Sequence, residues 1–207
     1  MENFTERKKT VFEEKILPIL SYVGAIGAGI MCIAYIIMVF VLINGFKAEK
    51  VQQITIFALV NAGVGFIILQ FLKVQGISFA KMIPENEAIL KLYYLSKTKD
   101  KKNHSLTYFW VTSVIKDVVM KCLMLAATTM GIIYIVIQGS NDYNLILLAF
   151  VNLLMFICFG FLGLVKAFEK FNENYIPYIK ERLAEKENKP YITDEGGQEN
   201  GKQQTLS

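Results

Sequence analysis

The chain alternates long apolar stretches with short charged ones. Four stretches carry no charged residue and run 31, 22, 20 and 23 residues, at 16–46, 51–72, 122–141 and 143–165. Because a helix needs roughly 20 apolar residues to cross the hydrocarbon core of a bilayer, each stretch predicts a transmembrane helix. The sequence therefore predicts an all-α integral membrane protein, a four-helix bundle, with spans at about 18–43, 52–72, 118–138 and 143–165.

The remaining segments are expected outside the membrane. Residues 1–15 form a charged arm before the four-span domain of residues 16–166, and residues 73–117 form the longest connection. In that connection, a proline followed by acidic residues predicts a short amphipathic helix from about Pro84 to Leu95.

The C-terminal part follows the fourth span directly. An apolar stripe predicts an amphipathic helix over 167–186, which Pro177 should kink or divide. The tail, 187–207, has few apolar residues and is predicted to be disordered.

The distribution of basic residues predicts the orientation. With both termini in the cytoplasm, only Lys47 and Lys50 lie on the outer side, and at least eighteen lysines and arginines lie inside. Positive charge favours the cytoplasmic side of membrane helices. We therefore expect both termini inside, in the plasma or inner membrane.

Small residues on the first span suggest a helix-packing face. Ser21, Ala25 and Gly29 follow one another at four-residue spacing, with Gly24 and Ala28 on the adjoining row. Small residues at this spacing let helix backbones approach closely in lipid. The alternative is that glycine and alanine are simply common in membrane helices.

Polar residues within the spans are the candidate midplane or pore-lining groups. Asn61 and Asn152 lie at similar depth in the second and fourth spans, and an amide in hydrocarbon needs a partner. Two interpretations stay open: the asparagines bond across a helix interface, or they line a wet path together with Thr128.

A charged pair, Asp117 and Lys121, lies at the inner end of the third span. The two residues are four apart on one helix face and can pair, with Lys121 snorkelling to the interface. The alternative is a positive ring at an inner pore mouth, formed only if several copies assemble.

The two halves of the chain resemble each other. Lys8-Lys9 matches Lys101-Lys102, residues 41–45 match 135–139, and 58–61 match 149–152, at offsets of 93, 94 and 91. A parallel duplication would make Asn61 and Asn152 equivalent. Similar composition of hydrophobic helices is the alternative explanation.

Several basic and aromatic side chains are candidates for contact with anionic lipid headgroups. They are Lys97, Lys99, Lys101, Lys102 and Trp110. The basic run has no aromatic-interleaved face or reader motif, so nucleic-acid binding is not expected.

Composition disfavours catalysis. The single histidine, His104, and the three scattered cysteines, Cys32, Cys122 and Cys158, give no metal-binding pattern. Catalytic motifs are absent. We expect no enzymatic activity, no metal and no cofactor.

Two functional hypotheses follow from these patterns. The first is a non-catalytic, partner-binding or accessory subunit of a membrane complex. The second is a homo-oligomeric channel or membrane-permeabilising pore, similar in kind to phage holins. Under both hypotheses, the expected partners of the protein are anionic lipids and either further copies of the chain or another membrane protein.

Overall fold

We analysed a computed structural model, which describes residues 10–45, 51–99, 106–140 and 142–187. The predicted disordered tail and most of the N-terminal arm lie outside the described residues, apart from Glu187, with which α6 ends. The regular elements of the described part are all helical. In chain order they are η1 (Phe12–Ile16), α1 (Leu17–Gly45), α2 (Val51–Lys81), α3 (Pro84–Lys99), α4 (Leu106–Gly139), α5 (Tyr143–Lys170), η3 (Phe171–Tyr175) and α6 (Ile176–Glu187).

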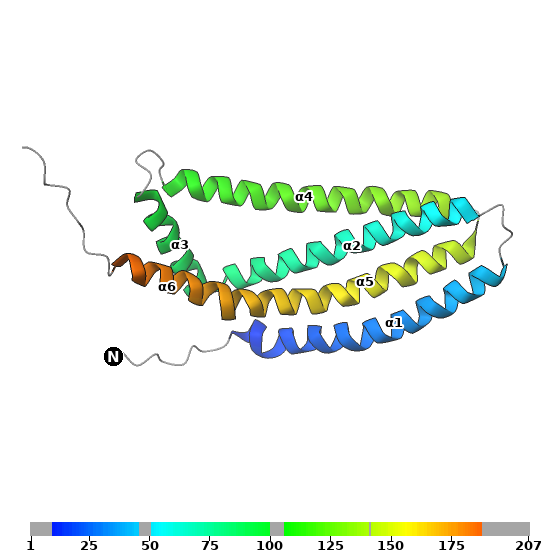
Figure 1. The fold of residues 1–207 in the computed structure, drawn as a ribbon, viewed down its shortest axis with the longest axis horizontal. Helices are drawn as coiled ribbons and strands as arrows, with labels where there is room; N and C mark the ends of the chain where they lie inside the picture. Colours follow the sequence, from blue (N-terminus) through cyan, green and yellow to red (C-terminus); the bar gives the residue numbers. More distant parts are fainter. Residues whose placement is uncertain (1–9, 46–50, 100–105, 141, 188–207) are drawn as a thin grey trace, which may run out of the picture.

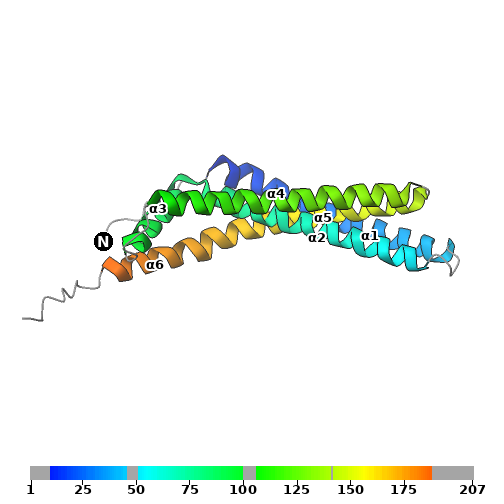
Figure 2. The same cartoon turned by 90° about the horizontal axis from the view of Figure 1, so that it is seen from above.

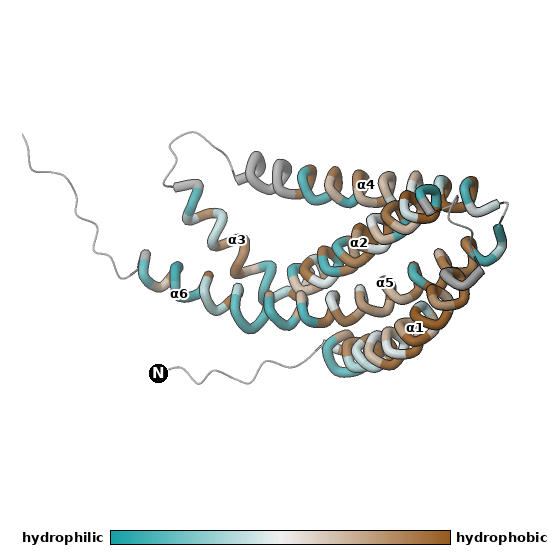
Figure 3. Tube along the Cα trace, turned by 45° about the vertical axis from the view of Figure 1, so that its right-hand side comes forward, coloured by the Kyte–Doolittle hydropathy of each residue, from teal (hydrophilic) through white to brown (hydrophobic). Residues whose placement is uncertain are grey.

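Four of the described helical stretches are long and apolar enough to cross a membrane. They are Phe12–Leu42, Gln52–Lys81, Val114–Gly139 and Tyr143–Glu185. Figure 3 shows hydrophobic positions running along the four long helices, while hydrophilic positions gather on α6. The predicted fold class, an all-helical protein with four candidate membrane spans, is confirmed.

The long helices form a layer rather than a square bundle. α5 packs against both α1 and α2, and α4 packs mainly against α2. Their order is therefore α1, α5, α2, α4, as Figure 1 shows, and from above they overlap in a narrow band (Figure 2). α5 and α2 are the two central helices, and α1 and α4 are the edges.

The two central helices run parallel in close register. A side chain at Gly65 would meet Phe156, 91 residues later, and one at Gly76 would meet Leu164, 88 residues later. The edge helix of each hairpin packs on the central helix of the other hairpin. A parallel duplication of the hairpin would give this crossed arrangement.

The short helices extend this correspondence. α3 begins after Ile83 at Pro84, and α6 begins at Ile176 before Pro177, 93 residues later. α3 and α6 contact each other at the end of the layer where α1 begins, which we call the α3–α6 end. Each hairpin is thus followed by a short helix that starts at an Ile-Pro step.

Two π-helical turns precede the helical prolines Pro18 and Pro177. The segments 12–18 and 171–177 read FEEKILP and FNENYIP, and in each the backbone N–H of the residue before proline donates to the carbonyl of the phenylalanine. Proline lacks an N–H and its ring crowds the carbonyl four residues earlier, so a wider turn accommodates it. The predicted division at Pro177 is not seen, because one helical stretch runs from Tyr143 to Glu185 and the π-helical turn accommodates the proline within it.

Candidate functional site at the α3–α6 end

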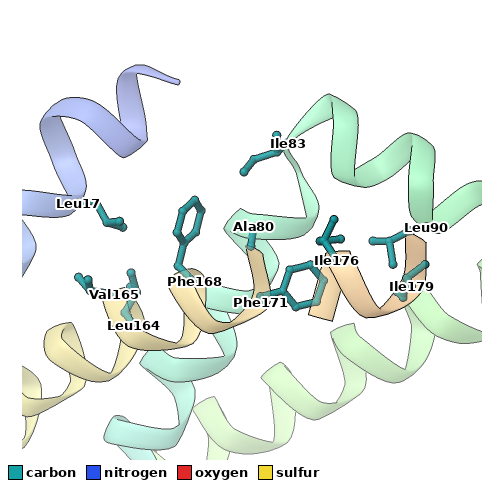
Figure 4. Close-up of a cluster of buried hydrophobic side chains, with 10 residues drawn as sticks. All are labelled: Leu17, Ala80, Ile83, Leu90, Leu164, Val165, Phe168, Phe171, Ile176 and Ile179. Carbon is teal, nitrogen blue, oxygen red and sulfur yellow. The ribbon is translucent and has the colours of Figure 1, made fainter. Parts of the chain in front are cut away.

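The larger of the two apolar clusters among the described residues lies at the α3–α6 end. It joins α1, α2, α3, α5, η3 and α6 through ten buried residues, drawn in Figure 4: Leu17, Ala80, Ile83, Leu90, Leu164, Val165, Phe168, Phe171, Ile176 and Ile179. The hydrophobic effect drives apolar side chains together in water, whereas it contributes little to the association of helices in lipid. Seven of the ten cluster residues lie beyond the uncharged stretches, where contact with water favours such packing.

Asn86 ties the short helices to the long ones. Its side chain is 1% exposed, and its Nδ2 donates to the backbone carbonyl of Ala80 and to Oδ1 of Asn172, both at 2.7 Å. These bonds join α3, the end of α2 and η3. The sequence analysis did not single out Asn86, since an asparagine in a first helical turn usually needs no distant partner.

The helices α5 and η3 follow each other without a gap, and together we call them the α5–η3 rod. A cavity of about 590 Å³ lies between α1 and this rod. Its wall combines apolar groups such as Phe168 with three carboxylates, on Glu13, Glu169 and Glu173. Glu13 also caps the first turn, because its Oε2 accepts from the backbone N–H of Thr10 at 2.9 Å. The cavity face of the rod is thus acidic.

A groove of about 500 Å³ lies on another face of the same rod. It runs from Ile77 of α2 along the rod, and its wall is almost wholly apolar. The rings of Phe171 and Tyr175 pack within it at a centroid distance of 5.0 Å. Lys170 is the charged side chain among its described lining residues.

The two midplane asparagines lie inside the helix layer. Asn61 is 2% exposed and Asn152 is 3% exposed. Since residues of α2 meet residues of α5 about 90 positions later, the two amides lie at the same level. Within the part of the chain that the structure describes, Oδ1 of Asn61 has no hydrogen-bond partner. Such burial favours a packing role within one copy over a wet path.

Substitution of Asn61 by leucine should test this interpretation. Leucine has a similar branched shape and removes an unpaired buried acceptor, which costs about 1–3 kcal/mol. We expect an unchanged or higher free energy of unfolding, by up to about 1 kcal/mol, measured by denaturant titration in mixed micelles. A loss of more than about 2 kcal/mol would mean that the amide has an essential partner.

The polar candidates on α4 share its half-buried stripe. Asp117 and Lys121 form the predicted ion pair, with a distance of 2.9 Å between Oδ2 and Nζ. The hydroxyl of Thr128 donates to the carbonyl of Met124 in its own helix at 2.8 Å. These three residues therefore lie on an edge helix, whereas Asn61 and Asn152 lie on the inner helices α2 and α5.

The small residues of α1 divide between two faces. Gly24 and Ala28 are buried, and an added side chain at Gly24 would lie 2.9 Å from the carbonyl oxygen of Cys158 on α5. Ala25 is exposed, and Gly29 has open space beside it. The Gly24 row packs internally, whereas the Ala25 row faces outward, with half-exposed Ser21 at the cavity.

The structure describes one of the headgroup candidates in full. Lys97 on α3 places its Nζ 4.9 Å from the centroid of the Tyr93 ring. Lys99 ends α3 and Trp110 lies in α4, but their side chains are outside the described residues, as are Lys101 and Lys102 altogether.

Metal-binding and disulfide chemistry have no candidate among the described residues. No group of three or more His, Cys, Asp or Glu side chains is arranged there to hold a metal ion. Cys32, Cys122 and Cys158 are free thiols. Cys158 serves as a packing residue, because its Sγ would lie 2.6 Å from a side chain at Gly27.

The fold and these sites define a multi-pass helical protein with four candidate membrane spans. No protein-family model matches the chain, no curated protein is significantly similar to it, and no solved structure significantly matches its fold.

Proposed function

We propose that this protein is a non-catalytic, multi-pass membrane protein that acts as a partner-binding or accessory subunit of a membrane complex. Both of its ends would lie in the cytoplasm, because the basic residues concentrate on the α3–α6 side. The observation that carries the proposal is the open layer of helices. Among the described residues, α1 packs on α5 and α4 packs mainly on α2, which leaves the outer side of each edge helix for a second protein.

The outward row of α1 is the best-defined part of this free surface. Ala25 is exposed and Gly29 has open space beside it, so another helix can approach the α1 backbone closely there. The packed α3–α6 end supports the same function. It packs α3 and α6 against α1, α2 and α5, which gives a second protein a packed surface outside the spans.

Site-specific photo-crosslinking in native membranes tests this proposal. A crosslinking amino acid at Gly29 should give adducts with another membrane protein or a second copy. The same amino acid at buried Ala28 should give only crosslinks within the chain. If position 29 yields lipid adducts alone, the free face of α1 is a lipid surface and the proposal is wrong.

The second candidate function is a homo-oligomeric channel or holin-like pore. The Asp117–Lys121 pair on edge helix α4 favours it, since half-buried charges on a span often mark an ion path. We expect no unitary currents from the reconstituted protein in planar bilayers. Unitary currents whose selectivity changes in Lys121→Glu would replace the subunit proposal with the pore.

A further inference from the structure

The acidic cavity between α1 and the α5–η3 rod lies where the uncharged stretches of both helices end. The stretch in α1 begins at residue 16, and the stretch in α5 ends at residue 165. Ser21 and Tyr22 line the cavity from within the uncharged stretch of α1, whereas the three carboxylates lie outside both stretches. Figure 1 shows α1 beside α5 here, with the start of α1 towards the α3–α6 end. One end of the cavity is therefore level with the spans, and its acidic end lies beyond them.

The wall that joins the two ends of the cavity is apolar and packed. It contains Leu17, Val165 and Phe168, which all belong to the buried cluster at the α3–α6 end. Figure 4 shows Leu17 on α1 across from Val165 and Phe168 on α5. The ring of Phe12 packs on the ring of Phe168 at a centroid distance of 5.4 Å. The cavity is thus preformed, as ligand pockets usually are.

Two of the three carboxylates are available to a cation. Glu13 is fixed by its capping hydrogen bonds at the start of the helix. Glu169 and Glu173 form no ion pair with a lysine or arginine among the residues that the structure describes. Lys166 and Lys170 are the nearest basic residues along the rod, but neither lines the cavity. The negative charge of the rod at the cavity is therefore not taken up by an internal ion pair.

The spacing of the acidic groups selects the kind of cation. In the described part of the chain, no three His, Cys, Asp or Glu side chains are close enough together to hold a metal ion. A metal ion needs its oxygen ligands at about 2–2.6 Å, whereas an organic cation spreads its charge over a larger surface. The apolar part of such a cation also gains from burial against an apolar wall. The cavity therefore matches a cation larger than a metal ion that carries an apolar body.

We propose that this cavity binds an amphipathic organic cation. The charged group of the ligand lies between Glu169 and Glu173, and its apolar body lies along the wall towards Tyr22. The volume of about 590 Å³ is typical of a pocket for one small ligand. The site does not depend on the proposed subunit function, which the crosslinking experiment tests separately.

Equilibrium dialysis of the full chain in dodecyl maltoside tests the site. Tetraphenylphosphonium is the cationic probe, triphenylphosphine oxide is its neutral relative, and micelles without protein give the blank for each. We expect saturable binding of tetraphenylphosphonium and clearly weaker binding of the neutral probe. The double variant Glu169→Gln/Glu173→Gln should weaken tetraphenylphosphonium binding about tenfold, because two charge interactions at an exposed site are lost.

The matched control is the double variant Glu14→Gln/Glu181→Gln. It removes the same charge at two exposed positions that do not line the cavity, so tetraphenylphosphonium binding should be unchanged. Equal weakening in the two double variants would overturn the proposal, because it would indicate diffuse attraction to a charged surface. Equal binding of the two probes, or no binding above the micelle blank, would also overturn it.

Filling the cavity gives a second readout that leaves its charge intact. Ser21 lines the cavity from α1, and Ser21→Trp places a large side chain there. Binding of tetraphenylphosphonium should fall to the level of the micelle blank while the circular dichroism spectrum stays helical. Undiminished binding by this variant would show that the probe lies elsewhere on the protein, and the proposal would be wrong.

Discussion

Alanine in place of Gly76 should destabilise the folded protein by about 3 kcal/mol, the upper part of the range for overpacked interiors. The added Cβ would overlap the carbonyl oxygen of Leu164 and lie 3.0 Å from its carbonyl carbon. A backbone group cannot rotate out of the way, so α2 and α5 must separate. Because α5 packs against both α1 and α2, the separation of α2 from α5 should loosen the whole layer.

The matched control for this prediction is Gly63→Ala on the same helix. An added Cβ at Gly63 has nothing within 4 Å, so its effect should stay within about 0.5 kcal/mol. Unfolding of both variants in mixed micelles, titrated with sodium dodecyl sulfate and followed by circular dichroism, gives the comparison. Equal stabilities would show that the α2–α5 contact is looser than described.

Substitution of Asn86 by aspartate should detach α3 from the rest of the protein. Both hydrogen bonds of the Asn86 side chain are donated by Nδ2, to acceptor oxygens at 2.7 Å. An ionised carboxylate cannot donate, and it would place negative charge against those two oxygens. A buried charge without a partner costs about 3–5 kcal/mol.

Hydrogen exchange measured by mass spectrometry should detect this effect as faster exchange in Pro84–Lys99 at pH 7. The difference in exchange rate between the variant and the wild type should be smaller near pH 4. Burial raises the pKa of the introduced carboxyl, and its protonated form can donate a hydrogen bond again. The control is Asn174→Asp, which adds the same charge at an exposed position on η3. If α3 exchanges equally in both variants, Asn86 is not the tie between the helices.

Local patterns in the sequence were sufficient to predict the helices and some of their details. The length of an uncharged stretch can be compared directly with the number of residues that a helix needs to cross a bilayer. This comparison made the four candidate spans recognisable. The Asp117–Lys121 ion pair depends only on the four-residue period of one helix. A local effect of Pro177 was also predictable from the chemistry of proline, but it takes the form of a π-helical turn within a continuous helical stretch and not of a division.

The ends of the helices were harder to predict from charge alone. The expected second span ended at 72, but α2 continues to Lys81 and turns only at the Ile83-Pro84 step. α4 begins at Leu106, well before the expected start of the third span. A helix does not end where its sequence becomes polar, because capping residues and prolines decide where backbone hydrogen bonding stops.

The sequence by itself determined that the chain is helical, that it has four candidate spans and that its halves resemble each other. Only the tertiary structure decided that α5 is central, that Gly24 and Gly76 are contact points while Gly29 and Gly63 are open, and that Asn86 joins three elements. The physical reason is that a span is apolar on every side, so hydropathy marks no inward face. Which face packs depends on the fit between helices that are distant in sequence.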